Sequence, residues 1–239
     1  MQYKQNPLDY FLQQRISENA KELKCKFNET LQEEQSCLEQ IRYSINHCKE
    51  NIAACEKYIK KNNVSSTQVI KNRKSAFKDN LTIWNMIGHI QMASIEMKEY
   101  LKRLCVNDID EWEQRAIIKS AYTAIHETSK KLVDCTSETI VFIKRNFPNF
   151  DYGIFAASRK ELTTFRDNKT AELTHIRKSL DAHREYDVAS QVDIFEGLHI
   201  SDAVQLIIEY GNIDNNLGST TQSIIELGLK RLQDCFKSY

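Results

Sequence analysis

The sequence has 239 residues, with 33 basic and 33 acidic side chains, 41% hydrophobic residues, and only 6 glycines and 2 prolines. Glycine and proline make up about 3% of the chain, against about 12% in average proteins, which leaves too few turn residues for a β-sandwich, a β-barrel or a doubly wound sheet. A net charge of zero argues against sequence-independent binding along phosphate backbones, but it is compatible with a small local phosphate site.

The first predicted element is one long helix over about 8–61. From residue 38 onward its apolar residues recur at alternating steps of three and four, the heptad pattern of a helix that packs lengthwise against another helix. Packing against the next helix of the same chain is favoured over a free coiled coil, because that helix is long enough to lie back along the first. The residues of this heptad seam are Leu38, Ile41, Ile45, Cys48, Ile52, Cys55 and Ile59.

Two further helices are expected in the middle of the chain. The polar stretch 60–67 is the first turn, and a second helix runs from there to about Leu104. Cap residues at 107–111 start a third helix, which ends near Phe147, directly before Pro148.

The C-terminal part is predicted to add two more long helices. The fourth starts at 155–158 and ends at 183–187, and an irregular stretch with a short helix follows it. The last begins at a cap formed by Ser201 and Asp202 and continues through Leu232. The fold class is therefore all-α, a bundle of about five long helices with an extended, coiled-coil-like N-terminal helix. Residues 1–65 form this helix, an arm or partner-docking element, and 66–239 form the bundle.

Several classes of protein are excluded by what the sequence lacks. It has no glycine-rich phosphate loop, no GxSxG, no HExxH, and no paired ExxH segments. No apolar run approaches the ~18–20 residues that cross a bilayer, and the N-terminus has no signal-peptide pattern. The sequence thus predicts a cytoplasmic protein without a cofactor, a bound metal or a membrane association. Its scattered cysteines, which show no zinc-ligand spacing, are expected to be small, buried or half-buried free thiols: Cys25, Cys37, Cys48, Cys55, Cys105, Cys135 and Cys235.

One pair of residues is suited to chemistry. The segment IRKSLDAHREYD at 176–187 contains Arg177 and His183, which are separated by about 9 Å of rise in a helix and so can flank one groove. A fixed guanidinium stabilises the charge that develops during cleavage of an RNA phosphodiester. An imidazole that titrates near neutral pH moves the 2′-OH proton or protonates the leaving oxygen.

Arg177-x5-His183, late in an all-α chain, resembles the R-x(4–6)-H motif of HEPN domains (higher eukaryotes and prokaryotes nucleotide-binding), especially the bacterial form with Ala before His. The resemblance covers about 80–236. It implies a dimeric helical bundle that acts as a metal-independent endoribonuclease in toxin–antitoxin, abortive-infection or other antiviral defence systems. Arg177 would hold the scissile phosphate of RNA and His183 would be the acid/base, with the residues of two protomers meeting across the dimer cleft. An antitoxin or another defence protein would be the partner.

Candidate auxiliary residues surround the motif. Lys178 stands where the family usually has Asn, Asp or His, and Asp181 and Arg184 flank His183. The basic cluster at 71–74 is a candidate guide for an RNA strand. A second basic cluster, Lys144 and Arg145, and the aromatic residues Phe150, Tyr152 and Phe155 are expected to be a solvated helix face and plugs of the bundle end.

A different class of function is also compatible with the sequence. Some HEPN-like proteins keep the fold without cleaving RNA, and Arg177 can form an ordinary surface ion pair with Asp181. The chain would then be a non-catalytic helical scaffold that assembles with a partner through its N-terminal helix.

Overall fold

The computed structural model describes residues 7–61, 67–106, 109–182 and 188–237, and nearly all of them are helical. No strand occurs in these ranges, which confirms the predicted all-α class. None of these helices is long and apolar enough to cross a bilayer. The elements are α1 (Pro7–Lys61), α2 (Thr67–Val106), α3 (Glu111–Asn146), α4 (Gly153–Arg177), the π-helix η1 (Lys178–Ala182), α5 (Val188–Glu196), α6 (Ile200–Ser219) and α7 (Thr221–Lys237).

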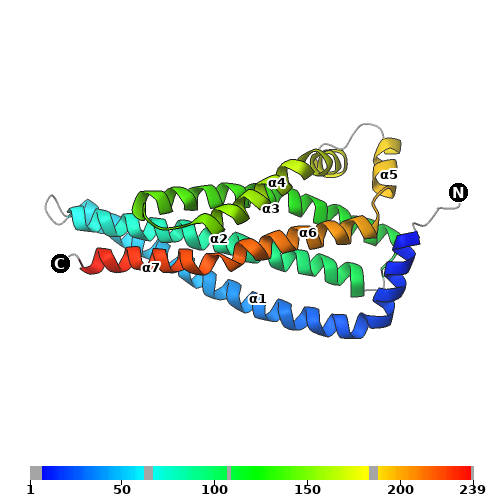
Figure 1. The fold of residues 1–239 in the computed structure, drawn as a ribbon, viewed down its shortest axis with the longest axis horizontal. Helices are drawn as coiled ribbons and strands as arrows, with labels where there is room; N and C mark the ends of the chain where they lie inside the picture. The colour runs from blue at the N-terminus through cyan, green and yellow to red at the C-terminus, as the bar shows by residue number, and fades with distance from the viewer. Residues whose placement is uncertain (1–6, 62–66, 107–108, 183–187, 238–239) are drawn as a thin grey trace.

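The long helices lie along one axis of the molecule, and α5 stands across the end where α4 finishes (Figure 1). Helix α2 is central, because it packs against α1, α3, α6 and α7. The buried apolar side chains of α2, α3, α4 and α6 join into one continuous core that extends to α1 and α7. The predicted five long helices correspond to α1, α2, α3, α4 and the α6–α7 pair.

Helix α1 packs along α2, as its heptad seam predicted. Ile41 and Cys48 of the seam are buried, and its other members are half-buried. Gly88 of α2 lets the two helices approach closely, since a Cβ there would lie 3.4 Å from Ile41 Cγ2. Glu34 of α1 forms an ion pair with Lys98 of α2. The boundary predicted at residue 65 falls outside the described residues. Helix α1, which precedes this boundary, packs against α2, which follows it.

Two helix starts show how well cap residues could be predicted. Asp110 caps α3 as expected, because its side chain accepts a hydrogen bond of 2.8 Å from the Glu113 backbone N–H. The last helix is capped two residues earlier than predicted: His199, not Ser201, is the N-cap of α6, Ile200 is its first residue, and Ser201 lies buried in its first turn.

The last predicted helix is interrupted at Thr220, where the sequence indicated continuity. Three consecutive hydroxyls bond back to backbone carbonyls, including Thr220 Oγ1 to Leu217 O at 2.7 Å and Thr221 Oγ1 to Gly218 O at 2.8 Å. Such hydroxyls compete with the backbone N–H groups for helical acceptors. The apolar periodicity continues across this point, so the sequence predicted one helix where the structure has α6 and α7.

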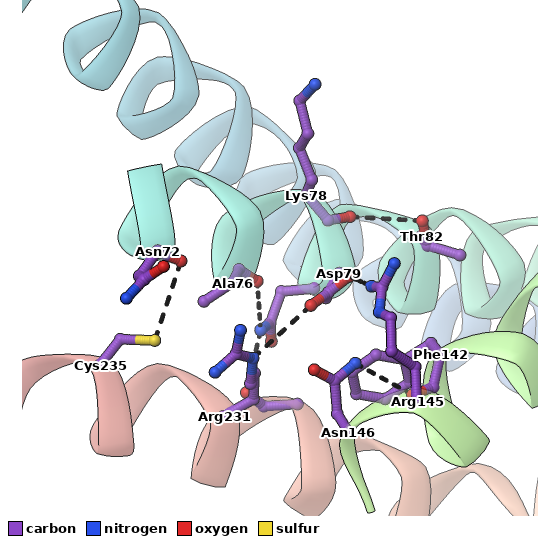
Figure 2. A network of polar contacts seen from close by, with 12 residues as sticks. Asn72, Ala76, Lys78, Asp79, Thr82, Phe142, Arg145, Asn146, Arg231 and Cys235 are labelled. Carbon is purple, nitrogen blue, oxygen red and sulfur yellow. Dashed lines mark hydrogen bonds and ion pairs between the residues drawn. The ribbon is translucent and has the colours of Figure 1, made fainter. Parts of the chain in front are cut away.

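A buried carboxylate joins three helices at the end of the bundle where the chain also ends. Figure 2 shows Asp79 of α2 between Arg145 of α3 and Arg231 of α7. Arg145 donates to Asp79 Oδ1, and the Arg231 Nε lies 3.6 Å from Oδ2. Burial raises the pKa of Asp79 although both arginines act in the opposite direction. This network fixes α7 against α2 and α3.

Candidate functional site

Arg177, the predicted phosphate-binding residue, is the last residue of α4 and contacts α3. Its Nε lies 2.9 Å from Glu127 Oε1, and the two side chains are 36% and 53% exposed. The guanidinium is therefore held at the surface by an ion pair between helices. A contact through Nε does not occupy the two terminal nitrogens, which are the groups that bind a phosphate in bidentate fashion.

The helix changes its geometry directly after Arg177. Lys178–Ala182 form the π-helix η1, whose wider turn departs from the α-helical pattern of α4. Single π-helical turns inside α-helices are rare and occur frequently at functional sites. The sequence predicted that the fourth helix continues to 183–187 and that an irregular stretch follows it. The change of geometry therefore occurs within the segment that carries the motif.

A buried histidine lies beside this ion pair. His126 of α3 is 2% exposed, and its Nε2 accepts a hydrogen bond of 2.8 Å from the Lys130 ammonium group. Burial lowers the pKa of His126, the charges of Lys130 and Arg177 lower it further, and Glu127 acts in the opposite direction. His126 is thus a neutral acceptor that holds Lys130, a second cation, on the same face of α3 as Glu127.

The other residues predicted for the site are placed only in part. Lys178 is exposed at the start of η1. Asp181 belongs to η1, but its side chain lies outside the described residues, and so do His183 and Arg184. The structure therefore places Arg177 and Lys178, and it leaves the Arg–His geometry of the motif untested.

The basic clusters do not lie next to Arg177. Lys144 and Arg145 are near the C-terminal end of α3, and Arg145 pairs with Asp79. In the 71–74 cluster, Lys74 forms an ion pair of 2.7 Å with Glu56 of α1. Both clusters lie at the end of the bundle where α4 begins (Figure 1). Arg177 is at the other end of α4, roughly 36 Å away by helix rise. Within one protomer the 71–74 cluster is therefore far from Arg177, and its role in guiding an RNA strand toward a dimer cleft stays a prediction.

The aromatic residues of the α3–α4 connection serve the core, as predicted. Phe155 is 2% exposed, and Phe150 and Tyr152 pack against the core cluster. The ammonium group of Lys144 lies 5.8 Å from the ring centroid of Tyr152. These rings close the end of the bundle.

Three of the residues around Arg177 gave little signal in the sequence. Glu127 is 50 positions from Arg177, and only the packing of α3 on α4 brings them together. His126 and Lys130 are four residues apart, the spacing of neighbours on a helix, but that pattern is common and does not mark a site.

Metal ligands do not gather in the described part of the chain: no group of three or more His, Cys, Asp or Glu side chains is placed to hold an ion. The seven cysteines are free thiols, of which five are buried or half-buried as expected, but Cys25 and Cys37 are exposed on α1 because they lie away from its seam with α2. No family model matches the sequence, and no curated protein or solved structure is significantly similar to it.

Proposed function

We propose that the chain is a metal-independent endoribonuclease of the HEPN type, active as a homodimer in the cytoplasm, in phage defence or a toxin–antitoxin system. Arg177 holds the scissile phosphate, and His183 moves the proton of the 2′-OH or of the leaving oxygen. The observation that supports this best is the fixing of Arg177 by Glu127 at 2.9 Å, where α4 changes into η1. A guanidinium positioned before the substrate arrives requires no reorganisation when charge develops on the phosphate.

Lys130 adds positive charge to this face of α3. Its ammonium group is held by the neutral His126, and the charge of Arg177 is close enough to contribute to the lowered pKa of that histidine. Two cations near one phosphate bind it more strongly than one, and both would stabilise the more highly charged transition state. Glu127 is a positioning residue, because it acts through Arg177.

The heptad seam of α1 is covered by α2, so a scaffold that recruits its partner through this seam would first have to separate the two helices. A partner of α1 would instead meet the polar outer face of the helix. A scaffold that binds a partner through α1 would therefore have less exposed apolar surface for that contact than the sequence suggested.

The test is cleavage of labelled total RNA and tRNA in EDTA by the purified full-length protein and its variants. Arg177→Ala and His183→Ala should each lower the cleavage rate by about 100-fold or more, as expected for loss of a charge-stabilising group or of an acid/base. Glu127→Gln should lower the rate by a smaller factor and leave the melting temperature nearly unchanged, because a half-exposed ion pair contributes about 0–1 kcal/mol.

Arg166→Ala is the matched control. Arg166 also lies on α4 and pairs with a carboxylate, Asp167, at 2.7 Å, but eleven residues before Arg177. It should cleave like the wild type. Circular dichroism spectra of all variants establish that they are folded. Cleavage that persists unchanged in His183→Ala would contradict the proposed mechanism.

A further inference from the structure

A pocket of about 250 Å³ lies between the N-terminal part of α3, η1 and α5. Trp112 and Lys119 of α3, Leu180 of η1, and Val188, Val192 and Phe195 of α5 contribute to its lining. Its volume is below the range of pockets that hold drug-sized ligands, and it is of a size for a single ring system.

The pocket contains an aromatic pair with an exposed surface. The rings of Trp112 and Phe195 stack with centroids 4.9 Å apart and an interplanar angle of 29°. Trp112 is nevertheless 59% exposed, so much of the indole that does not contact Phe195 faces solvent. An exposed aromatic face is the feature on which unpaired nucleobases stack.

Helix α5 adds apolar surface to the same pocket. It is nine residues long and has no buried residue, although Val188 and Val192 are apolar and 68% and 36% exposed. Lys119 brings a positive charge to the lining. An apolar slot with an aromatic wall and a cation beside it suits a base whose sugar carries a phosphate.

The pocket is continuous with the motif segment. Leu180 lies three residues after Arg177, and Val188 is the first described residue after the stretch that contains His183. Trp112 itself lies fifteen residues before Glu127 on α3, which is about 22 Å of helix rise, so a base stacked on Trp112 would belong to a nucleotide a few positions along the strand from a phosphate held at Arg177.

We infer that Trp112 and Phe195, with Lys119, form a subsite that binds one nucleobase of the RNA substrate a few nucleotides from the scissile phosphate. This inference rests on the proposed function for the identity of the ligand. The inference goes beyond the proposed function because it names residues that position a base, and none of these residues belongs to the Arg–His motif.

A second protein chain is a poorer occupant for this surface. A stable interface buries about 800 Å² on each partner, whereas only three apolar side chains of the pocket are strongly exposed: Trp112, Val188 and Val192. The concave shape also favours a planar ring over a protein surface.

The experiment measures binding through the fluorescence of Trp112, independently of cleavage. Trp84→Phe in the full-length protein removes the only other tryptophan, which is half-buried in α2. The ligands are the four nucleoside 5′-monophosphates and 2′-deoxy tetranucleotides, which lack the attacking 2′-OH. Ribose 5-phosphate, with a sugar and a phosphate but no base, is the matched control. The inference expects saturable quenching by the base-containing ligands and none by ribose 5-phosphate.

The kinetic counterpart compares Trp112→Leu with Trp112→Phe. Loss of one stacked base should raise the KM for RNA about tenfold in Trp112→Leu, and Trp112→Phe, which retains a ring, should stay within about threefold of the wild type. Tyr43→Leu is the control, because Tyr43 is also exposed, at 73%, and stacks on a neighbouring ring, but lies on α1. It should leave the KM unchanged.

The outcomes separate this inference from the proposed function. Quenching by nucleotides without any RNA cleavage would support the subsite and contradict the ribonuclease. Normal cleavage without quenching, and with an unchanged KM in Trp112→Leu, would overturn the subsite and leave the ribonuclease standing. Trp112 emission that changes with protein concentration, but not with nucleotides, would assign the pocket to an interface between copies of the chain and would also overturn the inference.

Discussion

Asp214 is the most deeply buried carboxylate that the structure describes with a strongly altered pKa. It lies on α6, is 1% exposed, and its Oδ1 has no hydrogen-bond partner among the described residues. Burial raises its pKa to about 8, and Glu34 of α1 adds to the increase, whereas Lys98 of α2 opposes it. Tyr210 lies one turn earlier on α6, close enough for the Asp214 carboxyl group to contribute to the raised pKa of its hydroxyl. The group is therefore largely protonated at neutral pH.

This residue gives the fold a defined pH dependence. The folded state holds the proton more tightly than the unfolded chain, in which the pKa is near its ordinary value of 3.8. The contribution of Asp214 to stability is therefore fully present below about pH 4 and is lost as the pH rises toward about 8.

Asp214→Asn should remove that dependence, because the amide has the size of the protonated acid and never ionises. We expect the variant to match the wild type near pH 4.5 and to exceed it near pH 8.5 by on the order of 2–4 kcal/mol in free energy of unfolding. Urea denaturation at the two pH values measures the difference. Asp134→Asn, at an exposed position of α3, is the control and should change stability little at either pH. A variant equal to the wild type at pH 8.5 would mean that Asp214 is not buried as described.

Close approach between helices depends on glycines that periodicity does not reveal. At Gly228 of α7, an added Cβ would lie 2.7 Å from Asn80 Oδ1 and 2.8 Å from Ile83 Cδ1, both on α2. The same glycine carbonyl accepts a hydrogen bond of 2.9 Å from Asn80 Nδ2. The contact is too tight for a methyl group, and separating the helices would break the hydrogen bond.

Gly228→Ala should therefore destabilise the protein by about 1–3 kcal/mol, the usual cost of overpacking. Gly211→Ala on α6 is a matched control, because a Cβ there meets nothing within 4 Å. It should stabilise the protein by about 0.5–1 kcal/mol, since alanine has the higher helix propensity. Thermal unfolding followed by circular dichroism compares the two. Equal shifts of the melting temperature in the same direction would contradict the close approach of α7 to α2.

The sequence predicted helices well where an apolar period coincides with a cap or a breaker. The start of α3 at Asp110 and its end before Pro148 are examples. It failed at Thr220, because side-chain hydroxyls interrupt α6 and α7 without altering the apolar period. Such breaks depend on a local competition for hydrogen bonds, which hydrophobic patterns do not record.

The candidate site could be predicted only as far as it is local in sequence. Arg177 was found because it belongs to a short motif, but Glu127 and Trp112 come from α3, at least 50 residues away. Contacts of that kind depend on how α3 packs on α4 and α5, and one sequence without a tertiary fold does not specify them. The all-α class needed less information, because composition and period already excluded the alternatives.

The dependence of the whole molecule on α1 can be tested by truncation. Leu31, Ile41 and Cys48 of α1 are buried, and burial of such side chains stabilises a fold by about 1.5–3 kcal/mol each for the larger ones. Glu34 of α1 also forms an ion pair with Lys98 of α2 and accepts a hydrogen bond from Ser94 of α2. The free energy of unfolding of a domain is only about 5–15 kcal/mol, so removal of α1 should abolish much of it.

A fragment of residues 66–239 should therefore melt at a much lower temperature than the full chain, or associate through the uncovered face of α2. Removal of residues 1–16 alone, which leaves Leu31, Ile41 and Cys48 in place, should change the melting temperature little. Circular dichroism melts and size-exclusion chromatography distinguish these outcomes. A monomeric 66–239 fragment with the melting temperature of the full chain would show instead that α1 is an appended arm, and that the bundle folds without it.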